Sequence, residues 1–495
     1  MRKTSFKKSI QRIFLTFTLV FCLVSMLNAQ WVSPGNGTTY TLPDLVSVSN
    51  GAVTNDGTVF SFNSDITISA NDVLKIDDQV TRIDAVGVLI TINGSMVCTN
   101  ATRVGIYGSM TQSQQFSMRF ENATNCKLKT LYFSDGCGIK LIESDVDFID
   151  CKFVYFTCDY ANAVIDFMNC NPLIEDCYFL RNEGAAISSP ANGQGSPRIL
   201  NNVLEENVTS NINSPQINLG PGAEDTIYIV GNEIDDDWAT HRVGGISIAD
   251  LMGTGSTKVL VKDNVVKNGR YGYNQQGLTI SSIIERNQFI DNHFEDNPMN
   301  GGSGISIYGM DGNNKATLRS NIITGNLWGI TAIYAFDIDL GTEDDWEYNQ
   351  IHDNGNGGVT YDLYNNSACD IMAVGNNWGT SNMRLIEAHI VHQNDDPSLG
   401  LVTYVPFIDV DGVNESNTLA FEISPNPVSN GNFTLTLEKA IPSVVMIYNV
   451  NGQIVKSQQI DNLINIVNIE TLESGVYFVE VRNAEERIVK KIIIK

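Results

Sequence analysis

The stretch SNIITGNLWGITAI, residues 320–333, contains the pattern that decides the fold. A short apolar strand follows Asn321, a second polar stop comes at Asn326, and an alternating strand begins after Gly329. Strands of three to five residues are too short to form a stable sheet alone. They become stable when copies of the same phrase pair with one another, so this stretch predicts an internal repeat.

The same phrase recurs from about residue 120 to about residue 380, and an Asn or a Cys marks each copy, at steps of 25, 26, 25, 30, 32, 23, 34, 28 and 27 residues. At this period each turn of chain can lie on the one before it, and every strand can pair in parallel with its copy about 4.8 Å away. Asn tolerates the left-handed backbone of a sharp corner, and stacked Asn amides can hydrogen-bond along a column. The predicted column consists of Cys126, Cys151, Cys177, Asn202, Asn232, Asn264, Asn287, Asn321, Asn349 and Asn376.

This pattern favours an all-β protein with a parallel β-helix over residues 30–408 and a cap at each end. A β-sandwich or a propeller would instead use hairpins spaced by about 8–12 residues or blades of about 40 residues. The repeat resembles the right-handed parallel β-helix family, which includes pectate lyase-like proteins, and the resemblance covers about residues 60–408. Trp378 and Tyr404-Val405-Pro406 are similar to the segment that covers the last coil in many secreted bacterial members, where an open end would expose strand edges.

The first 29 residues have the three zones of a secretory signal peptide: basic residues, an apolar stretch over residues 13–26, and a small-residue cleavage site at Ala29. The apolar stretch is too short to span a bilayer comfortably, so we expect cleavage and no transmembrane segment afterwards. The formal net charge is −25, and removal of the five basic residues of this segment would leave −30. Such an acidic chain disfavours nucleic acid as a partner.

The pattern changes after residue 408. Residues 409–420 are polar and are predicted to be a linker, whereas residues 421–495 alternate with a period of two residues, which is typical of a small immunoglobulin-like β-sandwich. This segment resembles the type A C-terminal sorting domain of the type IX secretion system. The resemblance implies export to the cell surface or the extracellular space, with the secretion machinery as partner. The matching residues are Pro425, Asn426, Pro427, Gly452, Gly475, Tyr477 and Lys495.

Seven of the nine cysteines lie between residues 98 and 177. The three in the predicted column would be about 4.8 Å apart, which is within disulfide range. The chain contains no Cys-x-x-Cys and no His near these cysteines, so the sequence disfavours zinc. We favour a buried column of thiols that replaces the Asn column, and one or two disulfides are the alternative.

Two acidic clusters stand beside an aromatic ring. Carboxylates next to a stacking ring suit calcium-assisted sugar binding, although solvated turn residues are the commoner explanation of such clusters. No cofactor is expected apart from an optional calcium ion. The candidate metal ligands are Asp235, Asp236, Asp237, Asp344 and Asp345, and the candidate sugar-binding rings are Trp238, Trp346 and Tyr273.

Catalytic candidates come from the long coil between Asn232 and Asn264 and from the coil that follows it. β-Elimination on a uronate needs a base and a cation that neutralises the carboxylate. Glycosidases instead need a pair of carboxylates, and none of the five His lies in the Gly-His-Gly segment that the β-helix glycosidases carry. No lyase or hydrolase signature stands out. The candidate catalytic residues are Arg270, Tyr271, Lys267, His241 and Arg242.

These observations predict an exported β-helix that binds carbohydrate or a surface partner along one flank. Residues 205–230, 235–258 and 292–315 are predicted to form the contact face. A polysaccharide lyase of the same fold and a purely structural stalk or adhesin are the alternatives.

Overall fold

The computed structural model describes residues 30–111, 113–157, 159–236, 242–253, 256–294, 302–310, 314–334, 337–355, 361–408, 420–437, 442–483 and 487–495. The predicted signal peptide and all but the last residue of the predicted linker lie outside the described residues. The chain divides into two compact units, Met1–Ile408 and Asp409–Lys495.

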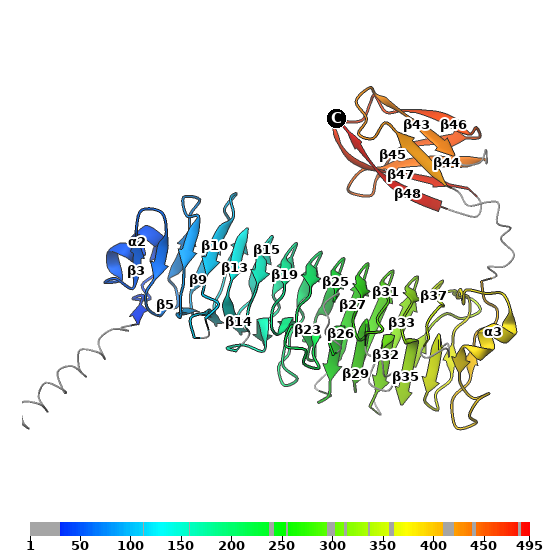
Figure 1. Cartoon of the computed structure of the whole chain (residues 1–495), viewed down its shortest axis with the longest axis horizontal. Coiled ribbons are helices and arrows are strands. Elements are labelled where there is room, and N and C mark those ends of the chain that lie inside the picture. Colours follow the sequence, from blue (N-terminus) through cyan, green and yellow to red (C-terminus); the bar gives the residue numbers. More distant parts are fainter. Residues whose placement is uncertain are drawn as a thin grey trace, which may run out of the picture. The chain divides into compact units, whose positions relative to one another are not determined.

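The first unit is a parallel β-helix built from three sheets (Figure 1). Sheet A contains β1 (Trp31–Val32), β5 (Ile66–Ile68), β8 (Leu89–Ile92), β11 (Phe116–Glu121), β14 (Gly136–Ile142), β17 (Ala163–Met168), β20 (Ala185–Ser188), β23 (Pro215–Leu219), β26 (Gly244–Asp250), β29 (Tyr273–Gly277), β32 (Ser303–Gly309), β35 (Trp328–Tyr334), β38 (Leu363–Asn366) and β40 (Ile390–Val391). Sheet B contains β2 (Thr39–Thr41), β6 (Val73–Ile76), β9 (Ser95–Cys98), β12 (Cys126–Lys129), β15 (Val146–Ile149), β18 (Leu173–Glu175), β21 (Arg198–Leu200), β24 (Thr226–Val230), β27 (Thr257–Lys262), β30 (Ile280–Glu285), β33 (Lys315–Arg319), β36 (Asp337–Asp339), β39 (Ile371–Met372) and β41 (Val402–Thr403). Sheet C contains β3 (Val53–Asn55), β4 (Phe60–Phe62), β7 (Arg82–Asp84), β10 (Val104–Tyr107), β13 (Leu131–Ser134), β16 (Lys152–Val154), β19 (Tyr178–Leu180), β22 (Val203–Glu205), β25 (Glu233–Asp235), β28 (Val265–Lys267), β31 (Gln288–Ile290), β34 (Ile322–Thr324) and β37 (Gln350–Ile351).

Each coil passes through sheet B, then sheet C, then sheet A, as β27, β28 and β29 do. Successive strands of a sheet pair in parallel and nearly in register, except that β3 and β4 are antiparallel. Alternate side chains point inward, because successive residues of a strand face opposite sides, and their Ile, Leu, Val and Phe side chains form one continuous core. This arrangement confirms the predicted parallel β-helix.

The corner between sheets B and C holds the polar column. In each coil from Cys151 to Asn376 one residue with a positive φ, such as Asn201 (55°) or Asp263 (56°), is followed by a column residue. The left-handed backbone therefore lies one position before the column Asn, and not on it as the sequence analysis expected. Each amide caps its neighbour: the backbone N and Nδ2 of Asn232 both donate to Oδ1 of Asn264, at 2.9 Å.

The column bonds run from Cys151 through Asn376. The prediction for Cys126 is wrong. Cys126 is the first residue of β12 and pairs with Val146, whereas the corresponding corner of that coil is Thr130 (φ 58°) followed by Leu131. The described cysteines, which include neither Cys22 nor Cys158, are free thiols.

A second ladder of side chains follows the corner between sheets C and A. Asn182 donates to Asn207, and farther along the unit Asn292 donates to Asn326 and Asn326 donates to Asn354. These bonds hold together turns that would otherwise carry unpaired buried amides.

Both ends of the β-helix are covered. At the first end, α2 (Leu42–Val48) starts with a capping box on Thr41 and buries Leu42 and Leu45. At the other end, α3 (Met383–Ala388) follows the buried Trp378, whose ring meets that of Tyr404 edge-on at 6.3 Å between centroids. Caps of this kind keep strand edges and core side chains from water.

The second unit is a sandwich of two antiparallel sheets around its own core. The three-stranded sheet contains β42 (Phe421–Ser424), β43 (Asn432–Leu437) and β46 (Ile464–Asn468), and the four-stranded sheet contains β45 (Ile454–Ile460), β44 (Ser443–Tyr448), β47 (Gly475–Arg482) and β48 (Arg487–Ile494). This confirms the predicted all-β second domain.

Candidate functional site

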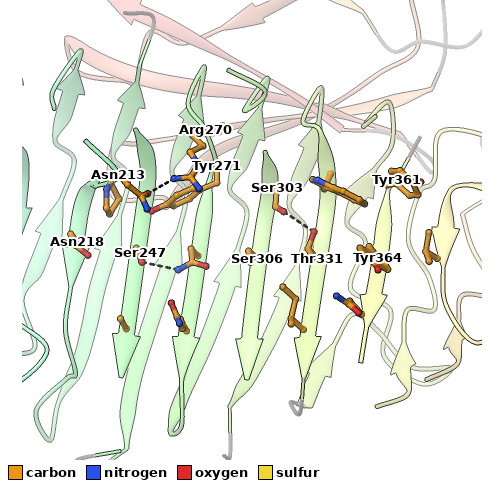
Figure 2. Close-up of a pocket in the computed structure, with 18 residues that line it drawn as sticks. Asn213, Asn218, Ser247, Arg270, Tyr271, Ser303, Ser306, Thr331, Tyr361 and Tyr364 are labelled. Atoms are coloured by element: carbon orange, nitrogen blue, oxygen red, sulfur yellow. Dashed lines mark hydrogen bonds between the residues drawn. The ribbon is translucent and has the colours of Figure 1, made fainter. Parts of the chain in front are cut away.

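A groove runs along the outer face of sheet A, from β23 to β40, with a volume of about 710 Å³ (Figure 2). The outward side chains of these strands line up because the strands pair in register. The central row of the groove consists of Asn218, Ser247, Asn274, Ser306, Thr331, Tyr364 and Val391.

The three predicted contact segments contribute to this face. Residues 205–230 include β23, residues 235–258 include β26, and residues 292–315 include β32. Each segment therefore contains a strand of sheet A and is not a single inserted loop.

Arg270 and Tyr271 lie in the groove, in the turn that leads into β29 (Figure 2). Arg270 Nη1 donates a hydrogen bond to Oδ1 of Asn213. The Tyr271 ring lies over Gly244, where a Cβ atom would be 2.1 Å from the ring. Desolvation raises the pKa of Tyr271 to about 12, so its phenol stays protonated at neutral pH. The site therefore offers a guanidinium and a neutral phenol side by side.

Three aromatic rings form a platform toward the other end of the groove. Trp328 stacks on Tyr361 with 4.5 Å between ring centroids and on Tyr364 with 5.3 Å, at interplanar angles of 26° and 18°. All three rings line the groove and are partly exposed. We call these three residues the aromatic platform. Flat apolar rings of this kind can pack against the apolar face of a ligand.

Hydroxyl and amide groups lie between the two ends of the groove. Asn274 Nδ2 donates to Oγ of Ser247 at 3.1 Å, and the hydroxyls of Ser303 and Thr331 are 2.9 Å apart (Figure 2). Such groups can both donate and accept hydrogen bonds. Among the described residues that line the groove, Arg270 is the one charged side chain, and no Asp, Glu, His, Lys or Cys is present.

The remaining catalytic candidates do not meet in this groove. Lys267 lies on sheet C, where it pairs with Glu233 at 3.0 Å and Asp235 at 3.2 Å. The hydrogen bonds that Lys267 donates to Glu233 and Asp235 raise its pKa, which makes it a poor base. Arg242 is exposed outside the groove, and its backbone N donates to Asn211. His241 lies outside the described residues.

The predicted sugar-binding role of Tyr273 is wrong. Tyr273 is completely buried, and its hydroxyl donates to Oε1 of Gln275 inside the core. The strand alternation points Tyr273 inward and Asn274 outward, so Tyr273 cannot contact a ligand on the surface. Trp346 packs on Gly375 at the corner between sheets B and C, away from the groove. Trp238 lies outside the described residues.

The acidic candidates that the structure describes do not form a metal-binding cluster. Asp235 accepts from Asn268 at 2.8 Å and pairs with Lys267 in sheet C, and Asp236 is buried nearby. Asp344 and Asp345 are exposed in the turn between β36 and β37. Within the described residues, no three His, Cys, Asp or Glu side chains come together in a way that could hold a metal ion. Asp237 lies outside them.

Sequence reasoning missed the aromatic platform. A signal was present, because Ile305 and Ile330 occupy equivalent positions in successive copies of the repeat and a glycine directly precedes each. Aligning these strands places Trp328 beside Ser303 at the start of the same outer face. Tyr361 and Tyr364 belong to a copy in which Asp362 replaces the glycine, so the motif is harder to recognise there.

The sandwich unit carries the residues predicted as the sorting signal. Asn426 connects to β48 in two directions, since Nδ2 donates to the carbonyl of Lys491 at 2.9 Å and Oδ1 accepts from the backbone N of Ile493 at 3.0 Å. Gly452 has a φ of 76° in the turn between β44 and β45, and the Tyr477 hydroxyl donates to the carbonyl of Glu473. The backbone N of Lys495 donates to the carbonyl of Val428.

Residues 422–495 match the family model described as a secretion system C-terminal sorting domain. This unit is a type IX C-terminal sorting domain. The sorting domain marks the protein for secretion to the cell surface or the extracellular space. No helix in the described parts of the chain has the length and apolar character needed to cross a lipid bilayer.

The β-helix was also compared with solved structures. A double mutant of the periplasmic alginate epimerase AlgG superposes with a TM-score of 0.42 at 13% sequence identity, covering 75% of this chain and 84% of that chain. The crystal structure of AlgG itself gives a TM-score of 0.36 at 13% identity, covering 74% and 83%. This similarity supports no inference about function. A search of curated proteins finds no match for this chain.

Proposed function

We propose that the protein is a secreted glycan-binding protein and that its ligand lies in the groove on sheet A. The aromatic platform is the observation that carries this proposal. Stacked, partly exposed rings at the surface of a secreted protein suit the apolar face of a sugar ring, and the neighbouring amides and hydroxyls suit its hydroxyl groups.

The dimensions of the groove favour a chain of sugars over a single one. From β23 to β40 the described part of sheet A makes six strand-to-strand steps. At about 4.8 Å a step, this corresponds to about 29 Å. The row from Asn218 to Tyr364 repeats polar side chains at the same interval, so an extended oligosaccharide could meet equivalent groups along its length.

The charge of the groove favours a glycan that carries a carboxylate or a sulfate. Arg270 is the one charged side chain among the described lining residues, and it stands beside the neutral phenol of Tyr271. A guanidinium binds such anions with paired, charge-assisted hydrogen bonds. This preference is local, because the chain as a whole has a formal net charge of −25.

Binding without cleavage is favoured over catalysis. Glycoside hydrolysis needs two carboxyl groups, and the described lining residues include none. A lyase needs a base with a pKa near the working pH, whereas burial raises the pKa of Tyr271 to about 12. The lyase stays the second candidate because Arg270 and Tyr271 share the groove. A purely structural stalk is the third.

A glycan array and a lyase assay together separate these three functions. The chain is applied to neutral, carboxylated and sulfated oligosaccharides, and the same oligosaccharides are followed for the absorbance of unsaturated uronates. We expect retention on acidic glycans, at least tenfold weaker retention of Arg270→Ala, and no absorbance change. Turnover that disappears in Arg270→Ala would establish the lyase, and the absence of retention on any glycan would leave the structural role.

A further inference from the structure

A buried carboxylate lies directly behind the aromatic platform. Asp362 separates Tyr361 from β38, which carries Tyr364, and its side chain is completely buried. None of the functions considered above uses this residue. Its contacts connect three parts of the molecule.

The first connection is to the ladder between sheets C and A. Four earlier coils carry a glycine at the position equivalent to Asp362, directly before the paired residues Ile246, Tyr273, Ile305 and Ile330. A Cβ atom on the last of these, Gly329, would be 2.3 Å from the carbonyl oxygen of Asp362 and 2.9 Å from Nδ2 of Asn354. At Asp362 the ladder ends instead on a carboxylate: Oδ1 accepts from the backbone N of Asn354 at 3.2 Å and from its Nδ2 at 2.9 Å.

The second connection is to the C-terminal cap. Oδ2 of Asp362 lies 3.1 Å from Nδ1 of His389, the C-cap residue of α3. The carbonyl of His389 in turn accepts from the backbone N of Asp362 at 2.8 Å. One residue of the cap is therefore bound to both the side chain and the backbone of Asp362.

The third connection is to the platform itself. The carbonyl of Tyr361 accepts from the backbone N of Gly329 at 2.8 Å, and the carbonyl of Asp362 accepts from the backbone N of Ile330 at 2.9 Å. These two bonds hold the backbone that follows Trp328 against the backbone of Tyr361 and Asp362, next to the point where the Trp328 and Tyr361 rings stack. Movement of Asp362 would therefore move both rings.

A carboxylate is a costly choice at this position. Burial raises its pKa to about 6, while the hydrogen bonds from Asn354 and the charge and hydrogen bond of His389 oppose that rise. An Asn could accept the same bonds from Asn354 without the cost of burying a charge. Among the described neighbours, the titratable groups are His389 from the cap and the adjacent Tyr361 and Tyr364; the ladder and β35 contribute amides.

We propose that Asp362 and His389 are positioning residues for the groove: through them the C-terminal cap holds Trp328 and Tyr361 in their stacked geometry. This inference rests on the proposed function for its consequence in binding. The geometry of the platform can be measured without any glycan, so failure of one proposal is distinguishable from failure of the other.

Fluorine NMR of the full chain labelled with 5-fluorotryptophan reports on the platform directly. The chain has five tryptophans, and the Trp328 resonance is assigned with Trp328→Phe. In both Asp362→Ala and His389→Ala we expect the Trp328 resonance to shift and broaden. The binding of an acidic oligosaccharide should weaken by about tenfold in Asp362→Ala and by about threefold in His389→Ala. Asp362→Asn, which keeps an acceptor for Asn354, should restore both the resonance and the binding.

The matched control is Asn182→Ala. It removes an equally buried amide of the same corner, which donates to Asn207 at 2.6 Å, at a point far from the platform. We expect it to lower thermal stability and to leave the Trp328 resonance unchanged. The inference is overturned if His389→Ala and Asp362→Ala leave the resonance as in the parent chain, or if Asn182→Ala alters it to the same extent. Altered resonances in a chain that binds no glycan would support the positioning role and reject the proposed function.

Discussion

The corner between sheets B and C is held together by two kinds of side chain, Cys in the earlier coils and Asn in the later ones. From Asn232 onward, each Asn side chain of the column accepts from the backbone N and the side-chain amide of the preceding Asn. In the earlier coils Cys177 stands in that place, and its sulfur accepts from the backbone N of Cys151 at 3.4 Å while donating to the carbonyl of Phe148. Sulfur is a weak acceptor and a weak donor, so the thiol corner makes fewer and weaker bonds.

The core packing next to the two regions differs in the opposite direction, because aromatic rings stack next to the Cys residues and aliphatic side chains lie next to the Asn residues. Under the thiol corner, Phe133, Phe153 and Phe179 stack with 5.0 Å and 4.7 Å between ring centroids. The same row continues as Leu204 and Ile234 under the Asn corner. Aromatic stacking adds to the energy of burial, so the comparison suggests that packing stabilises the first coils where the polar column is weak.

Asn287→Ala should have the largest effect. Oδ1 of Asn287 accepts from both the backbone N and Nδ2 of Asn264. The substitution leaves that buried backbone N without its partner and leaves Nδ2 with the carbonyl of Ile229. We expect a loss of about 4 kcal/mol in the free energy of unfolding, measured by urea denaturation. A loss below about 1 kcal/mol would mean that the Asn column contributes little.

Asp362→Asn tests the cost of ending a ladder on a carboxylate. The folded-state pKa of about 6 lies above the ordinary value of 3.8, so the folded state binds a proton more tightly, and this group destabilises the fold as pH rises from about 4 to above 6. The variant should therefore be more stable at pH 7.5, by up to about 3 kcal/mol, and the gain should disappear near pH 4. Thermal unfolding of both chains across this range is the measurement, and a gain that grows toward acid would contradict the account.

Two substitutions at Cys177 compare the two corners at a single site. Cys177→Ala should cost about 1 to 2 kcal/mol, less than the loss of an Asn from the column. Cys177→Asn should extend the Asn column by one coil and stabilise the protein by about 1 kcal/mol. Urea midpoints of the two variants decide this, and a destabilising Cys177→Asn would show that the thiol corner is shaped for sulfur.

The smallest expected effect concerns the reactivity of the cysteine thiols. Burial raises the pKa of Cys98, Cys126 and Cys170 to about 11, and a protonated thiol is a poor nucleophile. Iodoacetamide at pH 8 should leave these thiols unmodified in the folded chain and label the partly exposed Cys137 and Cys369 first. After unfolding, mass spectrometry should find that every cysteine reacts with iodoacetamide. Pairs of cysteines that stay unmodified would instead indicate disulfides, in contrast to the free thiols of the described residues.

Much of the fold could be predicted from the sequence, because the Asn residues must recur once in each coil. Periodicity gives the length of a coil but not the corner on which a residue lies. Cys126 is 25 residues before Cys151 and yet starts β12, since the earlier coil is shorter between Leu131 and Cys151.

The candidate site was predicted less well. Arg270 and Tyr271 both lie in the groove, as expected of residues that share one binding face. Tyr273, two residues farther on, points into the core instead. The platform joins Trp328 to Tyr361 and Tyr364, 33 and 36 residues later, and only the pairing of β35 with β38 brings these rings together.

Calorimetric titration with an acidic oligosaccharide tests the central claim most directly, with Trp328→Ala/Tyr364→Ala set against Tyr228→Ala. Tyr228 is a matched control, since its ring is partly exposed on the outer face of sheet B with Arg198 over it at 5.8 Å. We predict that the platform variant loses at least tenfold in affinity and that the Tyr228 variant binds like the parent chain. Equal binding by all three chains would show that the groove on sheet A is not the binding site.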